Sequence, residues 1–342
     1  MRCPITLKPL LATEYDIGYS RKGLKALTDN AKFNPMLNFD SQSFENRCPL
    51  KQKGMSISGY QPKLQLIIQH NQFDIIDSKG DFILKPSPTN RYPFLAENEH
   101  ATMQVMNALK FNVPENGLVY FKTQEPDKRE YAFVIKRYDR VNGEAVHQEQ
   151  LDGAMGIAEK YGKIKADGEQ YISYERAVKF ILDNVSDKDL TVKKDLFLRI
   201  VYAYLLGNND LHLRNFSLIA TQDHLISLAP VYDFVSVKPY PESFSDRLAL
   251  PLLEKEEGGQ QLAHGFETKY GCYLGMDFVE FGTKIGLSET LAKNLLINLV
   301  KSKEKVIAIY QHSFMPKKHI EQVIEYYQQR LYYLQIFNEP KL

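Results

Sequence analysis

Residues 206–216 read Leu206-Gly207-Asn208-Asn209-Asp210-Leu211-His212-Leu213-Arg214-Asn215-Phe216, and this stretch decides the fold of the chain. It directly follows an apolar run with a helical pattern. Within six residues it holds an aspartate, a histidine and an asparagine: Asp210, His212 and Asn215. A second aspartate, Asp233, follows about twenty residues later in the hydrophobic, strand-like segment Val231-Tyr232-Asp233-Phe234.

This order of residue types suits the transfer of a phosphoryl group to a hydroxyl. Such a site has to position the reactants and neutralise phosphate charge. We expect Asp210 to orient and deprotonate the hydroxyl, and Asn215 and Asp233 to hold Mg²⁺, which prefers oxygen ligands. We expect His212 to shape the catalytic loop rather than act as the base. Any one of these residues alone is more often a cap or turn residue, so the prediction rests on their shared order and spacing.

The chain has 342 residues, enough for two lobes. Strand patterns and one helical pattern (96–110) come first, with the strands at 63–68, 81–86, 117–121 and 131–136. Helical patterns follow at 150–161, 174–184, 192–207, 287–311 and 316–337. The sequence therefore predicts an α+β protein with a β-rich N-lobe at 1–145 and a helical C-lobe at 146–342. We expect a nucleotide to bind between such lobes.

Three segments of the expected N-lobe fit nucleotide contacts. In Ser56-Ile57-Ser58-Gly59-Tyr60-Gln61-Pro62-Lys63, small residues leave backbone amides open to phosphate oxygens. Lys85 ends an apolar strand and is expected to contact phosphates, with Glu99 or Glu97 as its partner. Lys136, Arg137 and Tyr138 follow the last strand, where backbone groups read adenine in kinase-like folds. Each segment alone also fits an ordinary turn or a solvated strand end.

Composition narrows the class of protein. A net charge of +1 argues against a surface devoted to nucleic acid, so any DNA contact is expected through a partner. The three cysteines, Cys3, Cys48 and Cys272, are far apart, which favours a reduced, cytoplasmic setting without a zinc site. No apolar run is long enough for a membrane span, and the N-terminus lacks a signal-peptide pattern.

The motifs together resemble those of the HipA-type serine/threonine kinases, toxins of bacterial toxin–antitoxin systems. Asp210-Leu211-His212-Leu213-Arg214-Asn215-Phe216 resembles the family's Asp-x-His-x-x-Asn-Phe motif, and Tyr232-Asp233 resembles its metal motif. The segment from Ser56 to Lys63 resembles the Gly-rich loop, and Lys85 the strand lysine. Lys136 stands where the family usually has glutamate, before Arg137-Tyr138-Asp139-Arg140. The resemblance covers roughly residues 50–240 and implies a bilobed, protein-kinase-like fold related to phosphoinositide kinases.

The resemblance also implies a function. A HipA-type toxin uses ATP and Mg²⁺ to phosphorylate a serine of an aminoacyl-tRNA synthetase, which stops growth. The short segment before Ser56 resembles HipT of three-component systems, whose target is tryptophanyl-tRNA synthetase, whereas HipA modifies the glutamyl enzyme. HipS-like and HipB-like antitoxins are the implied partners. Ser56 and Ser58 are the implied autophosphorylation sites, where a phosphate's charge would repel ATP.

Two other classes remain open at this point. The chain could be a kinase of small molecules or lipids, because a fold does not fix its substrate. It could also be an inactive nucleotide-binding subunit of an antitoxin–DNA complex. The presence of Asp210, Asn215 and Asp233 together argues against the inactive subunit. Phosphoserine on a synthetase, rather than a modified metabolite, would distinguish the protein kinase from a kinase of small molecules or lipids.

Overall fold

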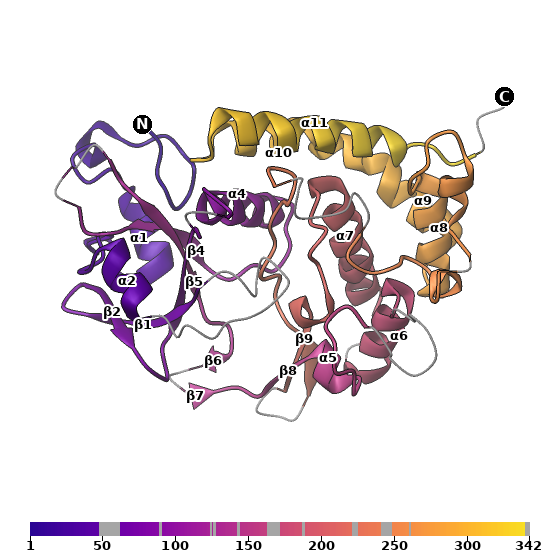
Figure 1. Ribbon diagram of the computed structural model, residues 1–342, viewed down its shortest axis with the longest axis horizontal. Helices are drawn as coiled ribbons and strands as arrows, with labels where there is room; N and C mark the ends of the chain where they lie inside the picture. Colours follow the sequence, from indigo (N-terminus) through magenta and orange to yellow (C-terminus); the bar gives the residue numbers. More distant parts are fainter. Residues whose placement is uncertain are drawn as a thin grey trace. The chain divides into compact units, whose positions relative to one another are not determined.

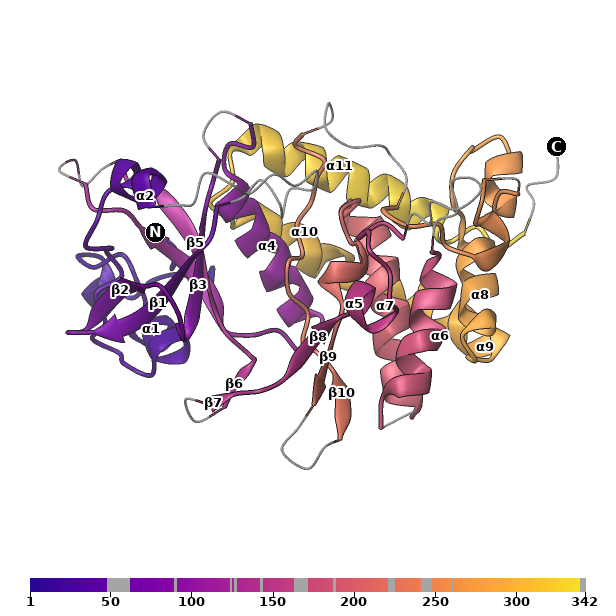
Figure 2. The same ribbon diagram turned by 60° about the horizontal axis from the view of Figure 1, so that its bottom comes forward.

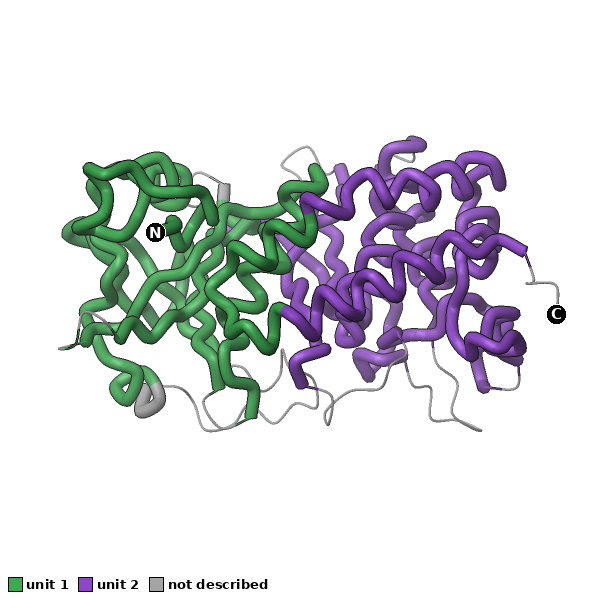
Figure 3. The backbone as a smooth tube through the Cα atoms, turned by 90° about the horizontal axis from the view of Figure 1, so that it is seen from above, with its two compact units in different colours: residues 1–144, 306–320 green, residues 145–305, 321–342 purple. Residues whose placement is uncertain are grey.

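The computed structural model describes residues 1–47, 62–88, 91–123, 125, 128–141, 144–162, 172–186, 189–220, 225–240, 248–259 and 261–338 (Figure 1). The chain divides into two compact units (Figure 3). Unit 1 contains Met1–Glu144 and Val306–Ile320, and unit 2 contains Ala145–Lys305 and Glu321–Leu342. Residues 306–320, which the sequence pattern assigns to the helical C-lobe, thus lie in unit 1.

Unit 1 is built on an antiparallel sheet with the strand order β2-β1-β3-β5-β4. The strands are β1 (Leu64–Gln69), β2 (Gln72–Ile76), β3 (Phe82–Pro86), β4 (Asn116–Tyr120) and β5 (Tyr131–Lys136). His70 and Asn71 join β1 to β2 with φ angles of 48° and 66°. Two residues with positive φ match the twist of a tight hairpin, which pairs these strands without a longer loop.

The N-terminal residues cover one face of this sheet. They include η1 (Ala12–Glu14), α1 (Arg21–Thr28) and α2 (Ser41–Arg47). Their apolar side chains form a buried cluster with alternate residues of the strands, among them Leu84, Ala132 and Val134. Ser20 caps α1 by accepting a hydrogen bond from the N–H of Gly23. Burial of this apolar area ties the N-terminal segment to the sheet.

Helix α4 (Leu95–Ala108) covers the opposite face and packs against β3, β4 and β5 (Figure 1). Successive strand residues point to opposite faces, so Lys85 and its register partner Phe133 face away from Leu84 and Val134. This register places the Lys85 side chain on the α4 side of the sheet. The helix predicted at 96–110 and the four predicted strands are confirmed within two residues, whereas β2 has no counterpart in the sequence prediction.

Unit 2 is mainly helical. Its helices are α5 (Leu151–Ala154), α6 (Tyr174–Asn184), α7 (Leu190–Leu206), α8 (Gly275–Lys284) and α9 (Glu289–Ile297), followed by η6 (Asn298–Ser302), α10 (Lys303–Gln311) and α11 (Lys317–Tyr333), the last two shared with unit 1. Asp189 caps α7 through the N–H groups of Thr191 and Val192. Phe197 of α7 stacks on Phe281 of α8 with ring centroids 5.9 Å apart. The mostly buried α7 is the helix that precedes the predicted catalytic loop.

A small antiparallel sheet accompanies the helices of unit 2, with the strand order β10-β9-β8 (Figure 2). Its strands are β8 (Gln148–Gln150), β9 (Ser217–Ala220) and β10 (Ile226–Leu228). A separate short pair links β6 (Arg140–Val141) to β7 (Glu144–Ala145). Strand β9 begins directly after Phe216, so this sheet holds the end of the predicted catalytic loop.

Several sequence expectations for residues after 150 are wrong in extent. The helix predicted at 150–161 stops after α5, and the chain continues through turns to residue 162. The helix predicted at 287–311 is broken into α9, η6 and α10, and α8 had no predicted counterpart. The strand-like segment 231–234 forms no strand. The helix predicted at 174–184 coincides with α6.

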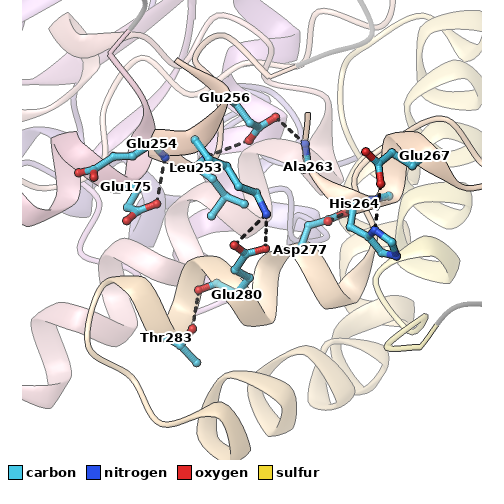
Figure 4. Close-up of polar contacts among 12 residues, drawn as sticks. Glu175, Leu253, Glu254, Glu256, Ala263, His264, Glu267, Asp277, Glu280 and Thr283 are labelled. Atoms are coloured by element: carbon cyan, nitrogen blue, oxygen red, sulfur yellow. Dashed lines mark hydrogen bonds and ion pairs between the residues drawn. The ribbon is translucent and has the colours of Figure 1, made fainter. Parts of the chain in front are cut away.

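Residues 253–280 of unit 2 are held by buried carboxylates (Figure 4). Asp277 accepts hydrogen bonds from the N–H groups of Leu274, at 2.8 Å, and Gly265, at 3.1 Å. Glu256 accepts from the N–H groups of Leu253 and Ala263 and from the Tyr273 hydroxyl. These bonds fix η4 (Glu254–Glu256) and η5 (His264–Glu267) beside α8. We call residues 253–280 the carboxylate-held segment.

Among the helices of the described ranges, none has both the length and the apolar composition for a bilayer crossing.

Candidate functional site

The predicted catalytic loop begins where α7 ends. Gly207 adopts φ = 67° and terminates the helix in the left-handed region. A Cβ atom at this position would lie 2.5 Å from Cγ of Lys238, so only glycine fits. The N–H of Val237 donates to the Gly207 carbonyl at 2.9 Å. The chain therefore turns abruptly out of the helix and into residues 208–216, with the segment after Asp233 bonded to the turn.

Hydrogen bonds within the loop set the positions of Asp210, His212 and Asn215. The His212 N–H lies 2.8 Å from the Asp210 carbonyl and 3.1 Å from Oδ1 of Asn215. The Asn215 N–H donates to the His212 carbonyl at 2.9 Å. The short helix η2 (Leu213–Asn215) closes this turn. The three side chains are nearly buried, so the loop presents a fixed set of polar groups.

Asp233 is bound to the same loop through its neighbour. The Tyr232 hydroxyl contacts the Arg214 carbonyl at 2.9 Å and the Ser217 hydroxyl at 2.5 Å. Asp233 has φ = 52°, a left-handed conformation that aspartate tolerates better than most residues. Its negative charge favours the protonated form of His212. The structure thus brings Asp210, His212, Asn215 and Asp233 into one region of unit 2.

Tyr161 and Lys160 join this region, although no sequence motif predicted them. The Tyr161 hydroxyl donates to Oδ1 of Asp210 at 3.0 Å. The Lys160 carbonyl accepts from the Leu213 N–H at 3.0 Å. Both residues lie in the turns after α5, where the sequence pattern predicted helix. No spacing rule links residues 160–161 to 210–215, and only the folded chain shows their contact.

His212 is a buried histidine held in the neutral form. Burial, with a smaller contribution from the charge of Lys160, lowers the pKa of His212 to about 3. Its side chain is 2% exposed, and neither ring nitrogen has a hydrogen-bond partner among the residues that the structure describes. Buried polar atoms without partners are rare in folded proteins, and each calls for a specific explanation.

In unit 1 the choice between Glu99 and Glu97 is settled. Nζ of Lys85 lies 2.6 Å from Oε1 of Glu99, and both side chains are buried. The ammonium also lies 5.7 Å from the centroid of the Phe133 ring. Glu97 instead faces Ser87, whose hydroxyl is 3.4 Å from its Oε2, and burial raises the pKa of Glu97 to about 7. The ion pair therefore joins β3 to α4 through Glu99.

Lys136 and Arg137 leave β5 with their polar groups engaged inside unit 1. Their N–H groups donate to the carbonyls of Glu115 and Asp81, each at 2.8 Å. The Lys136 side chain pairs with Asp29 at 3.0 Å, and Arg137 forms a two-bond contact with Asp139. A pocket of about 400 Å³ borders these side chains, and its lining also includes Asp29, Ile68, Asp81, Phe82 and Arg140. These two N–H groups are therefore already used within unit 1.

Most of the predicted Gly-rich loop, Ser56, Ser58, Gly59, Tyr60 and Gln61, lies outside the described residues. Pro62 and Lys63 are described and directly precede β1.

Asn215 and Asp233 offer oxygen atoms of the kind that Mg²⁺ prefers. In the described part of the chain, no group of three or more histidine, cysteine, aspartate or glutamate side chains is arranged for a metal. Magnesium in nucleotide sites takes one or two protein ligands and shares the phosphates. Oδ1 of Asn215 uses one lone pair for the His212 N–H, and a carbonyl oxygen has two. Asn215 with Asp233 thus fits a nucleotide-bound magnesium rather than a protein-only metal cage.

Comparison with known sequences points in the same direction. Residues 55–307 match the family described as HipA-like C-terminal domain. A Haemophilus influenzae protein named "Putative kinase" is 56% identical over 343 residues, covering 99% of both chains. The serine/threonine-protein kinase toxin HipA of Shewanella oneidensis is 28% identical over 214 residues. That match covers 58% of this chain and 46% of the toxin, so the chain matches less than half of the toxin's length.

Two solved structures have a similar fold. One is HipA in the Shewanella oneidensis complex of HipA, HipB and operator DNA, with a TM-score of 0.64 and 22% identity. It matches 86% of this chain and 69% of that one. The other is the Helicobacter pylori proinflammatory kinase CtkA, with a TM-score of 0.51, 13% identity and coverage of 80% and 88%. At these identities the likeness concerns the fold, and it confirms the predicted α+β, kinase-like architecture.

Proposed function

Because the chain belongs to the family of HipA-like C-terminal domains, we propose that it is a serine/threonine protein kinase toxin that uses ATP. The observation that carries this proposal is the loop at 207–216. It buries an aspartate, a neutral histidine and an asparagine together, and it is bonded to the segment of a second aspartate. Burying polar groups without hydrogen bonds costs stability, and both ring nitrogens of the buried His212 lack partners among the described residues.

The transfer step assigns one role to each residue. A serine hydroxyl of the target attacks the γ-phosphorus of ATP, and its proton passes to the Asp210 carboxylate. The new oxygen–phosphorus bond forms as the bond to the β–γ bridging oxygen breaks, and ADP leaves with that electron pair. Tyr161 holds Asp210 by the 3.0 Å hydrogen bond, and neutral His212 keeps the loop in shape.

Asn215 and Asp233 would hold Mg²⁺, which neutralises phosphate charge when bound. Lys85 would contact the phosphates, as strand lysines do in kinases. Glu99 fixes the Lys85 ammonium by the 2.6 Å ion pair, so the lysine is oriented before ATP arrives. Asp233, Lys136, Arg137 and Tyr138, with Ser58 to Lys63, are our proposed nucleotide contacts, and Ser56 and Ser58 the proposed autophosphorylation sites.

We propose tryptophanyl-tRNA synthetase as the protein target and glutamyl-tRNA synthetase as the alternative. HipS-like and HipB-like proteins are the proposed antitoxin partners, with DNA reached through them. The related HipA in the solved complex is bound to HipB and operator DNA, which supports an antitoxin partner here. These proposals rest on the resemblance of the chain to HipA-type toxins.

Phosphotransfer from labelled ATP with Mg²⁺ tests the function. Each of the two synthetases is offered separately to the wild type and to Asp210→Asn. Label on the tryptophanyl enzyme that disappears in the variant supports both the activity and the target. Label on the glutamyl enzyme, or on the toxin alone, keeps the kinase and rejects the tryptophanyl target. If no protein is labelled, mass spectrometry of the peptide with Ser56 and Ser58 shows whether the purified chain is already phosphorylated. An unphosphorylated peptide would then leave the inactive nucleotide-binding subunit as the better account.

A further inference from the structure

Lys160 and Tyr161 lie outside every predicted motif, yet both contact the loop that carries Asp210. We propose that Lys160 is a further catalytic residue, whose ammonium binds the phosphoryl group during transfer, and that Tyr161 is a positioning residue for Asp210. The proposal rests on the kinase activity proposed above and identifies a cation of the same site. It follows from the backbone anchoring, the Tyr161 bond and the charge balance around Lys160.

The backbone of Lys160 is fixed to the catalytic loop. Its carbonyl accepts the Leu213 N–H at 3.0 Å, three residues from Asp210. The preceding residue, Glu159, tightens the turn: its Oε2 accepts the Tyr161 N–H at 2.9 Å and its carbonyl accepts the Gly162 N–H at 2.8 Å. The position of Lys160 is therefore set by the fold before any substrate binds.

Tyr161 connects this turn to the base. Its hydroxyl donates to Oδ1 of Asp210 at 3.0 Å, and its ring meets the His212 ring edge-on with centroids 5.5 Å apart. The two contacts hold the phenol at its hydroxyl and at its ring. The hydrogen bond restricts rotation of the Asp210 carboxylate, and a general base must accept its proton from one direction.

Lys160 brings a buried positive charge to the same place. Its side chain is 9% exposed, and Nζ lies 4.9 Å from the centroid of the Tyr161 ring. Burial lowers the pKa of Lys160, while the nearby negative charge of Asp210 acts against that shift. Arg214, the basic residue of the loop itself, is paired with Asp152. A cation that the charge of Asp210 acts on thus comes from the 155–162 segment.

The charge balance explains what this cation would bind. An ammonium that is partly withdrawn from water is more stable when negative groups compensate it. The charges of Asp210 and Glu159 both favour the ammonium at rest, and Asp210 loses its charge when it takes the proton of the attacking hydroxyl. At that moment the transferring phosphoryl group carries the negative charge that Lys160 needs. Lys160 would therefore bind the phosphoryl oxygens more strongly in the transition state than in the ground state.

The test compares wild type with Lys160→Met, Lys160→Arg and Tyr161→Phe. Lys179→Met is the control, since Lys179 pairs with Glu175 on α6. Melting temperatures establish folding, calorimetry gives ATP and ADP affinity with Mg²⁺, and labelled ATP gives kcat. If Lys160→Met does not fold, Lys160→Gln replaces it under the same criteria.

We expect Lys160→Met to lower kcat by about a hundredfold or more and to weaken ATP binding relative to ADP binding. Lys160→Arg should recover part of the rate, and Lys179→Met should match wild type. Tyr161→Phe should lower kcat about tenfold, the equivalent of one hydrogen bond to a charged group, with both affinities unchanged.

Wild-type kcat together with a wild-type ratio of ATP to ADP affinity in the lysine variant would overturn the role of Lys160. An unchanged kcat in Tyr161→Phe would overturn the positioning role. If wild type itself transfers no phosphate, the proposed function fails. The ratio of ATP to ADP affinity then still decides whether Lys160 binds the terminal phosphate.

Discussion

Two segments of unit 2 bury carboxylates in opposite ways: the loop at 207–216 and the carboxylate-held segment at 253–280. In the carboxylate-held segment, Asp277 and Glu256 accept hydrogen bonds mainly from backbone N–H groups of the turns around them (Figure 4). In the loop, Asp210 accepts a hydrogen bond from the hydroxyl of a side chain, Tyr161, that belongs to another segment.

The histidine of the loop completes the contrast. Both ring nitrogens of His212 lack partners within the described residues, and so do both amide atoms of Asn208, which is fully buried. Burial without bonds costs free energy, whereas burial with backbone bonds holds a turn together. The difference separates carboxylates that are bonded to the turns around them from buried polar side chains that lack partners among the described residues.

The largest expected effect is the difference in phosphotransfer rate between substitutions at Asp210 and at Asp277. Asp210→Asn should lower phosphotransfer by about a thousandfold or more, because the amide cannot accept the hydroxyl proton. Asp277→Asn, assayed well below its melting temperature, should keep the wild-type rate. Initial rates with labelled ATP measure both. Equal losses of rate in the two variants would show that the two aspartates do not differ in function.

The second effect concerns stability. Asp277→Ala leaves the N–H groups of Leu274 and Gly265 without their acceptor, so we expect unfolding free energy to fall by about 3 kcal/mol. Asp210→Asn keeps the shape of the side chain, so its free energy of unfolding should fall by less. Urea unfolding of both variants gives the two values. A greater loss in Asp210→Asn than in Asp277→Ala would assign the loop a structural role.

A smaller effect uses the buried histidine of unit 1. Nε2 of His100 lies 3.1 Å from the Ile5 carbonyl, and burial lowers the pKa of His100 to about 4. Below pH 6.5 the unfolded chain takes up a proton that the folded chain refuses. Stability should therefore fall with decreasing pH, by about 1.4 kcal/mol per pH unit from this group, until pH 4. His100→Gln should remove that part of the slope, measured by urea unfolding between pH 7 and pH 4.5. An unchanged slope would contradict the assignment.

The smallest effect lies within the carboxylate-held segment. The Tyr273 hydroxyl donates to Glu256 at 2.9 Å and accepts the Leu252 N–H at 3.2 Å. Tyr273→Phe should cost about 1 kcal/mol of stability, because Glu256 keeps its two backbone donors. Phosphotransfer should be unaffected. A rate loss in this variant, with the stability loss absent, would show that the carboxylate-held segment serves the reaction.

The sequence predicted what local patterns determine. The helical pattern at 174–184 located α6, alternation located β1, and a β-rich run closed by proline located β3 with Lys85 near its end. The grouping of Asp210, His212 and Asn215 was predictable because they lie within one turn of the chain. The helix expected at 150–161 fails where Gly156 adopts φ = 68°, a left-handed turn that ends helical hydrogen bonding.

Contacts between distant segments were not predictable. Glu97 and Glu99 both lie near the start of α4, so the sequence alone does not say which of them meets Lys85. The packing of α4 on β3 brings Glu99 to the lysine. The bond from Tyr161 to Asp210 spans 49 residues, and nothing in the spacing marks it. The expected use of backbone groups at Lys136 and Arg137 also depended on tertiary structure, because Glu115 and Asp81 bind their N–H groups.

Gly207 ties the length of α7 to the direction of the catalytic aspartate. Each residue of an α-helix turns the chain by about 100° and advances it by about 1.5 Å. One residue inserted between the buried body of α7 and Gly207 would swing Asp210 by that angle, away from Tyr161 and the Asp233 segment. We therefore expect an insertion or deletion near the end of α7 to impair the site more than most substitutions there. The length of α7 up to Gly207 thus determines the direction in which Asp210 points.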